Sequence, residues 1–83
     1  MTEYRFLFIV ENDQSKVIGH GSLRNFAAAT QEVAANVLKE IMEKRLKQED
    51  GLDVKIIITG CKIIDDQNPD TEKDYVFVKP EYR

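Results

Sequence analysis

Alternation of apolar and polar residues near the start of the chain predicts a β-hairpin. Residues 3–11 are rich in aromatic and branched side chains, which favour a strand. Residues 12–15 are Asn, Asp, Gln and Ser, whose side chains bond to nearby backbone amides in turns. A second strand is expected over residues 16–28, where Gly19 and Gly21 indicate a bulge or an irregular edge.

The clearest element of the pattern is a helix in the middle of the chain. Apolar residues recur at spacings of three and four between positions 33 and 46, which places them on one helical face. They are Val33, Ala34, Val37, Leu38, Ile41, Met42 and Leu46. Thr30 is the expected N-cap, and Asn25 is an alternative that would start the helix about one turn earlier. Gly51 is the expected stop.

Two further strands are expected after the helix. Residues 52–64 are strand-like, and Gly60 is expected to interrupt their alternation. An acidic loop occupies residues 65–73, and a last strand covers residues 74–79. The predicted order of elements is therefore ββαββ.

The lengths of these elements match one another. A helix over residues 31–48 would be about 27 Å long, and an eight-residue strand would be about 26 Å long. Matched lengths are what a two-layer sandwich requires. The predicted fold class is α+β, with a four-stranded, mainly antiparallel sheet and one long amphipathic helix on one face. Residues 1–83 are expected to form a single domain.

The strands are apolar on both sides near their middles, although a sheet with one wet face normally alternates apolar with polar residues. In the first strand, Tyr4, Phe6, Phe8 and Val10 point to one side, whereas Arg5, Leu7 and Ile9 point to the other. One helix covers only one face. We therefore expect an apolar patch on the other face, and such patches usually mark an interface. It would be built from Leu7, Ile9, Ile57 and either the Tyr75 side or the Val76 side of the last strand.

The acidic loop has two interpretations. It carries Asp65, Asp66, Asp70, Glu72 and Asp74 against only Lys73 within residues 65–74. Solubility and edge protection are one explanation, and docking onto a basic partner is the other. The residues expected to bind a partner are Leu7, Ile9, Ile57, Asp65, Asp66, Asp70 and Glu72.

Composition narrows the classes of function. The chain has 83 residues, with 15 acids against 12 bases and a formal charge of −3. Because non-specific nucleic-acid affinity comes mainly from basic residues, nucleic acid is an unlikely partner on this count. One cysteine, no long apolar run and no basic, apolar leader are typical of a cytoplasmic protein with no membrane segment.

No pattern of residues predicts catalysis, a metal site or a bound cofactor. His20 and Cys61 are the only residues of their types, and Cys61 is interpreted as a small buried apolar residue. The acidic loop lacks the central glycine and terminal glutamate of an EF-hand loop. The segment Gly19–Ser22 lacks the lysine of a phosphate-binding loop. The acids are expected in solvated positions with ordinary pKa values.

The sequence therefore predicts a small non-enzymatic module that binds another protein, as an inhibitor, adaptor or accessory subunit, and that also forms homodimers. One alternative is a module that binds nucleic acid through the open sheet face, where Tyr4, Tyr75 and Phe77 would offer stacking surfaces. Another alternative is an enzyme whose site is assembled between protomers.

Overall fold

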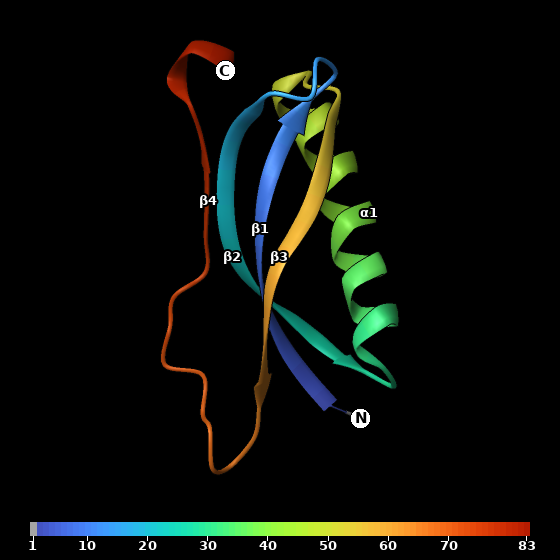
Figure 1. The fold of residues 1–83 in the computed structure, drawn as a ribbon, viewed down its shortest axis with the longest axis vertical. Helices are drawn as coiled ribbons and strands as arrows, with labels where there is room; N and C mark the ends of the chain where they lie inside the picture. The colour runs from blue at the N-terminus through green and yellow to red at the C-terminus, as the bar shows by residue number, and fades with distance from the viewer. Residues whose placement is uncertain (1) are drawn as a thin grey trace.

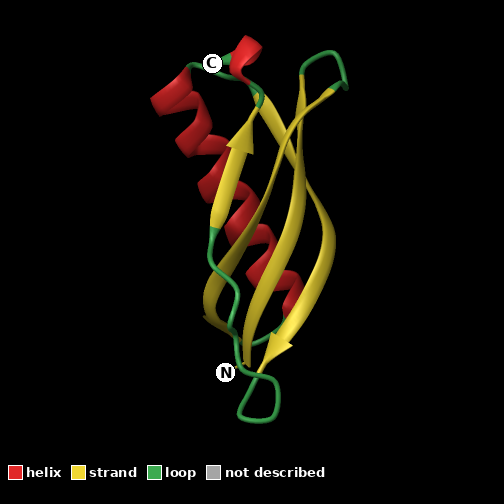
Figure 2. Cartoon of the chain, turned by 90° about the vertical axis from the view of Figure 1, so that its left-hand side faces the viewer, coloured by secondary structure: helices red, strands yellow, loops and turns green. Residues whose placement is uncertain are grey.

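The computed structural model describes residues 2–83, in which four strands form one antiparallel sheet in the order β3-β1-β2-β4 (Figure 1). The elements are β1 (Thr2–Asn12), β2 (Val17–Ala28), α1 (Gln31–Asp50), β3 (Val54–Ile64), β4 (Tyr75–Val78) and the short 3-10 helix η1 (Pro80–Tyr82). Helix α1 lies on one side of the sheet only (Figure 2). The predicted α+β two-layer architecture is confirmed.

Strand β1 is the centre of the sheet, because it pairs with β2 on one side and with β3 on the other. Its even-numbered residues Tyr4, Phe6, Phe8 and Val10 are buried beneath α1, as their alternation predicted. The register between β1 and β3 shifts beside Thr59, where Ile58 pairs with Phe8 and Gly60 with Leu7. The predicted break in alternation near Gly60 is thus a β-bulge.

Both predicted ends of α1 are confirmed. The Thr30 hydroxyl accepts a hydrogen bond from the backbone N–H of Val33 and so caps the first turn. Gly51 ends the helix in the left-handed conformation, with φ at 66°, and its N–H bonds to the last carbonyls. Asn25, the alternative cap, is buried in β2 and donates from its side chain to the Ala34 carbonyl.

The predicted buried face of the helix was too wide. Ala34, Leu38, Met42 and Leu46 form one stripe at four-residue spacing and contact the sheet core. The neighbouring stripe of Val33, Val37 and Ile41 is 41–56% exposed. A helix presents only about 100° of its surface to a flat layer, so only one of the two adjacent stripes becomes buried.

The bulge predicted for β2 is present beside Gly19, where the register shifts so that Val10 pairs with Gly19 and Glu11 with Val17. The alternative prediction, an irregular edge, is wrong. Strand β2 is an inner strand, and β4 pairs with it through Gly19–Ser22. A Cβ at Gly19 would collide with the Phe77 carbonyl, and one at Gly21 would collide with the Phe8 ring and the Tyr75 carbonyl. Glycine is therefore required where β4 and the core approach β2.

Strands β3 and β4 lie at opposite edges of the sheet, so the segment that joins them must cross one of its faces. Residues 65–74 make this crossing on the face opposite α1, since they contact Arg5, which lies on that face. We call residues 65–74 the strap. Figure 1 shows the strap leaving the end of β3 and returning along the other edge.

Candidate interaction surface

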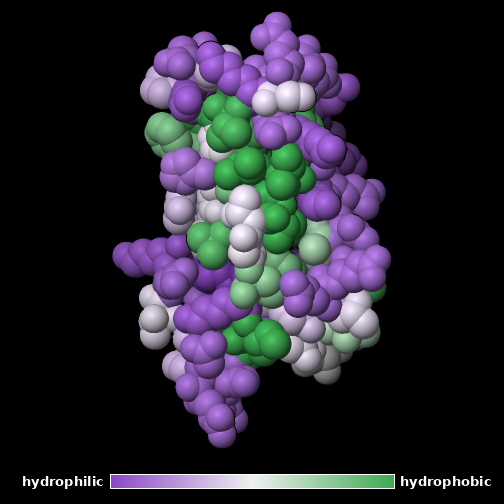
Figure 3. Space-filling view, viewed as in Figure 1, coloured by the Kyte–Doolittle hydropathy of each residue, from purple (hydrophilic) through white to green (hydrophobic). Residues whose placement is uncertain are grey.

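The sheet face that α1 leaves uncovered carries two rows of residues, most of them apolar. One row runs across the strands through Ile57, Ile9, His20 and Phe77. The next row runs through Gly60, Leu7, Ser22 and Tyr75. We call these two rows the band. Figure 3 shows hydrophobic atoms running down the middle of this face between polar borders.

Exposure within the band is high for side chains of this type. Leu7, Tyr75 and Phe77 are 43–46% exposed, and Ile9 and Ile57 are half-buried. The predicted apolar patch on the second face is therefore present, and the last strand contributes Tyr75 and Phe77 to it, not Val76 and Val78. Leu7 leans over Gly60, where an added Cβ would lie 3.0 Å from its Cδ1 methyl group.

Three rings form a cluster at the β4 end of the band. The His20 ring lies 5.7 Å from the Tyr75 ring, edge to face, and 5.3 Å from the Phe77 ring. Such arrangements stabilise aromatic clusters beyond simple burial. Tyr4, which was expected to join a stacking surface on the open face, is instead part of the core beneath α1.

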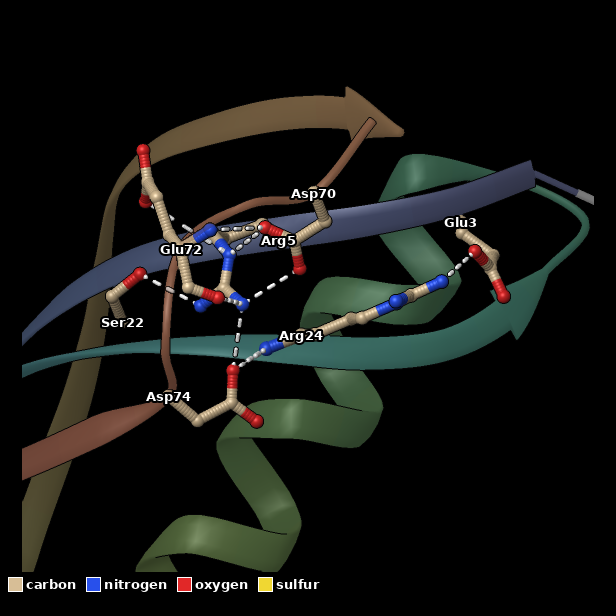
Figure 4. Close-up of polar contacts among 7 residues, drawn as sticks. All are labelled: Glu3, Arg5, Ser22, Arg24, Asp70, Glu72 and Asp74. Carbon is tan, nitrogen blue, oxygen red and sulfur yellow. Dashed lines mark hydrogen bonds and ion pairs between the residues drawn. The ribbon is translucent and has the colours of Figure 1, made fainter. Parts of the chain in front are cut away.

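One end of the open face is closed by the strap, which Arg5 holds in place (Figure 4). The Arg5 guanidinium donates two hydrogen bonds to the Asp70 carboxylate, from Nε at 2.8 Å and from Nη2 at 2.7 Å. It also donates to the Ser22 hydroxyl at 3.1 Å and to the Glu72 backbone carbonyl at 2.9 Å. We call this arrangement the clasp.

Further charges surround the clasp. Asp74 forms an ion pair with Arg5 Nη2 at 2.8 Å and accepts a hydrogen bond from the Arg24 backbone N–H at 3.1 Å. The Arg24 side chain pairs with Glu3. The Glu72 carboxylate stands 3.9 Å from Arg5 Nε. Among residues 2–83 no buried side-chain N or O lacks a hydrogen-bond partner. The strap is thus fixed by a satisfied polar network, which is what a buried charge requires.

The clasp shifts the pKa values of both Arg5 and Asp70. Hydrogen bonding to Asp70 raises the pKa of Arg5, despite the opposing effect of burial. The Arg5 guanidinium in turn holds the pKa of Asp70 below its ordinary value. The expectation of ordinary pKa values for the acids therefore fails at Asp70.

The four acids expected to bind a partner have different surroundings. Asp70 has a side chain only 3% exposed and is engaged by Arg5 within the chain. Asp65 accepts from the backbone N–H groups of Gln67 and Asn68 and so closes the turn. Asp66 is exposed, and the Glu72 side chain is 54% exposed, so these two remain available to a partner.

The other border of the band carries charges of both signs. Lys55 lies opposite Glu11 one row beyond Ile57, and Lys79 follows Phe77 by two residues. Neither lysine has an acid within ion-pair distance among the described residues. Glu11, Asp13 and Asp53 lie beside Lys55, so this border, like the strap, carries acids as well as bases.

His20 and Cys61 cannot act together, because they lie on opposite faces of the sheet. His20 pairs with Ile9 on the open face, whereas Cys61 pairs with Phe6 on the side of α1. Burial raises the pKa of the Cys61 thiol, which makes it a poorer nucleophile at neutral pH.

A groove of about 510 Å³ lies between α1 and β4 on the other face. Its apolar lining includes Leu23, Met42, Leu46 and Val76, and its rim carries Arg45, Glu49, Asp74 and Arg83. No group of three or more potential metal ligands occurs within residues 2–83. Over the same residues, α1 is too polar to span a bilayer.

Comparison with known proteins adds no assignment, because no family model, curated protein or solved structure matches this chain.

Sequence reasoning missed Arg5 as the organising residue of the open face. It placed Arg5 correctly beside Leu7 and Ile9 but gave it no partner. A signal was present, since an arginine in the middle of an apolar central strand needs compensating acids, and the strap holds the largest group of them.

Proposed function

We propose that this protein is a small non-enzymatic interaction module that binds another protein through the band on its open sheet face. The observation that carries the proposal is the exposure of Leu7, Tyr75 and Phe77 on one face of a well-formed sheet, where His20 and Ser22 of β2 lie between Leu7 and the two rings. Contiguous apolar patches on folded domains usually mark interfaces. A single unpaired cysteine suits a cytoplasmic setting for this role.

The rigidity of the face supports this role. The clasp fixes the strap at one end of the band, and the glycines of β2 allow β4 to pack closely beside it. A preformed surface loses less conformational entropy on binding than a mobile one. A preformed apolar surface of this kind suits an adaptor, an inhibitor or an accessory subunit.

The test is a comparative pull-down from a lysate of the organism that encodes the protein. Wild type, Leu7→Glu and Ile41→Glu serve as baits. Ile41 is 56% exposed on the outer side of α1, so Ile41→Glu is a matched change of an exposed aliphatic residue away from the band. The proposal expects proteins that bind wild type and Ile41→Glu but not Leu7→Glu. Equal recovery with all three baits would refute a role for the band.

A second candidate function follows from the ring cluster. His20, Tyr75 and Phe77 are exposed on adjacent strands, and Lys79 lies at their border. Exposed aromatics beside cations are how many sheets stack single-stranded nucleic acid. Fluorescence anisotropy with labelled single-stranded DNA and RNA at low salt tests this candidate. Binding that weakens with salt and is lost in Tyr75→Ser would support it, and no binding would exclude it.

A further inference from the structure

We infer that the protein binds a short extended segment of another polypeptide, which pairs with the outer edge of β4 and inserts alternate side chains into the groove between β4 and α1. The inference goes beyond the proposed function, because this groove lies on the α1 side of the sheet and the band lies on the opposite side. Three features support it: unpaired backbone groups on β4, a groove beside them, and groove walls with little unpaired charge.

The outer edge of β4 offers backbone hydrogen-bonding groups to a further strand. Strand β4 ends the sheet, and its one neighbour is β2. The N–H of Lys79 bonds to the Ile18 carbonyl of β2. Because successive residues of a strand direct their backbone groups to alternate sides, Val78 and Val76 direct theirs outward. Within residues 2–83, no hydrogen bond from another segment reaches these outward groups.

The ends of β4 limit the partner to a short segment. Pro80 takes the next outward position and has no N–H to donate, and the strap precedes the strand at its other end. The usable edge is therefore the four residues of β4, which span about 13 Å. A folded partner normally buries about 800 Å² on each side, more than such an edge supplies. A short peptide needs only a few main-chain bonds and pockets for alternate side chains.

The groove supplies a pocket for those side chains. Strand β4 and helix α1 lie next to each other on the side of the molecule that faces the viewer in Figure 2. The groove between them measures about 510 Å³, within the range of about 300–1,000 Å³ that is usual for ligand pockets. Its apolar lining is Leu23, Met42, Leu46 and Val76. A strand added beside β4 continues the pleat of the sheet, so every second side chain points towards α1 and this lining.

The charges around the groove are mostly paired within the chain. Arg45 pairs with Glu49 at 3.3 Å, and Asp74 is held by the clasp. The other charged residues of the lining are Asp50 and Arg83, whose charges are opposite. Walls without a net unpaired charge match an apolar segment that is recognised through its backbone. They do not match a polyanion such as nucleic acid, which requires an excess of bases.

The first experiment selects binders to the immobilised full chain from a phage-displayed library of random peptides. The selected peptides should share apolar residues at alternate positions. One of them, synthesised with a fluorescein label, should bind wild type in fluorescence anisotropy. Its dissociation constant should change by less than about threefold between low and high salt, because main-chain bonds and apolar contacts are screened little.

The second experiment compares two substitutions at one position of the edge. Val76→Pro removes the outward N–H and keeps the pairing of β4 with β2, because an edge strand tolerates proline where its N–H side faces solvent. Val76→Thr is the matched control, since it keeps the N–H and a branched side chain of similar shape. Val76→Pro should raise the dissociation constant at least about tenfold, and Val76→Thr should change it by less than about threefold. Circular dichroism spectra check that both variants are folded.

Methylation of the peptide tests the same pairing on the wild-type protein, so this result does not depend on the folding of a variant. N-methyl groups at the alternate positions whose N–H groups face β4 should abolish binding. N-methyl groups at the intervening positions should weaken it much less. Hydrogen exchange gives an independent readout, because the amides of Val76 and Val78 should exchange more slowly when the peptide is bound.

The outcomes separate the inference from the proposed function. A library that yields no peptide for wild type overturns the inference, and so does a peptide that is indifferent to the position of its N-methyl groups. A peptide that is lost in Leu7→Glu but retained in Val76→Pro lies on the band, which refutes the inference and supports the proposed function. A dimer in sedimentation velocity that Val76→Pro converts to a monomer would assign the edge to a second copy and overturn the inference. Binding that is lost in Val76→Pro and unchanged in Leu7→Glu supports it.

Discussion

Replacing Arg5 with methionine tests the clasp, because it removes the guanidinium but keeps an unbranched side chain of similar length. The Arg5 side chain is 2% exposed and holds Asp70, Ser22 and the Glu72 carbonyl. Removing one member of a buried ion pair costs about 3–5 kcal/mol, because the other is left without its partner. We expect about 3 kcal/mol, the lower end of that range, since Glu72 and Asp74 are half exposed and water can solvate them.

A loss of this size is large for a domain of 83 residues. Total stabilities of about 5–15 kcal/mol are usual, and each kcal/mol moves the midpoint by about 4–8 °C in a domain of this size. Thermal and urea unfolding followed by circular dichroism should therefore show Tm lowered by about 12–24 °C in Arg5→Met. Arg5→Lys keeps the charge but loses the bidentate hydrogen bond to Asp70. Its Tm should therefore lie between those of Arg5→Met and wild type.

The dependence on pH gives a second readout. The folded protein holds the pKa of Asp70 below its ordinary value, so this carboxylate adds stability that is fully present above that value. The contribution disappears as the pH falls through the ordinary value of about 3.9 towards the lower folded value. The stability gap between wild type and Arg5→Met should therefore be constant above about pH 5 and should narrow below pH 4. An unchanged urea midpoint in Arg5→Met at pH 7 would refute the clasp as the anchor of the strap.

Two other changes test local features of the fold. Gly51→Ala should lower stability by about 1 kcal/mol in urea unfolding, because a left-handed φ of 66° strains alanine while no neighbouring atom lies within 4 Å of the added methyl group. Gly51→Asn should cost less, since asparagine tolerates this conformation, and an equal loss in both variants would contradict the backbone explanation. Cys61, whose thiol pKa is raised by burial, should react more slowly with a disulfide reagent at pH 8 in the native state than in urea. Equal rates in the two states would show that the thiol is not protected.

Much of the fold follows from local patterns in the sequence. The alternation in residues 4–10 correctly assigned which side chains of β1 face the helix, because a strand offers only two faces. Thr30 and Gly51 set the ends of α1 through bonds within a few residues of each helix end. Such short-range chemistry acts in the same way whatever the rest of the fold does.

The errors arose where distant parts of the chain meet. Val33, Val37 and Ile41 have the right spacing for a core stripe, but the position of α1 on the sheet buries the adjacent stripe instead. Asp70 looked like a surface acid because its partner Arg5 is 65 residues away. The bond between them depends on β3 and β4 lying at opposite edges of the sheet, and strand order is not encoded in any local pattern.

The attachment of β4 also determines which part of the molecule unfolds first. Strand β4 pairs with β2 through four residues, whereas β1, β2, β3 and α1 share most of the core. Breaking the clasp, those four pairings, the bond from the Lys79 N–H to the Ile18 carbonyl and the core contacts of Val78 would release everything after Ile64. The three longer strands and the helix would remain together. The last 19 residues of the chain should therefore exchange their amide protons through a partial opening that requires less free energy than complete unfolding. In that open form, Gly19–Ser22 would become an unpaired strand edge.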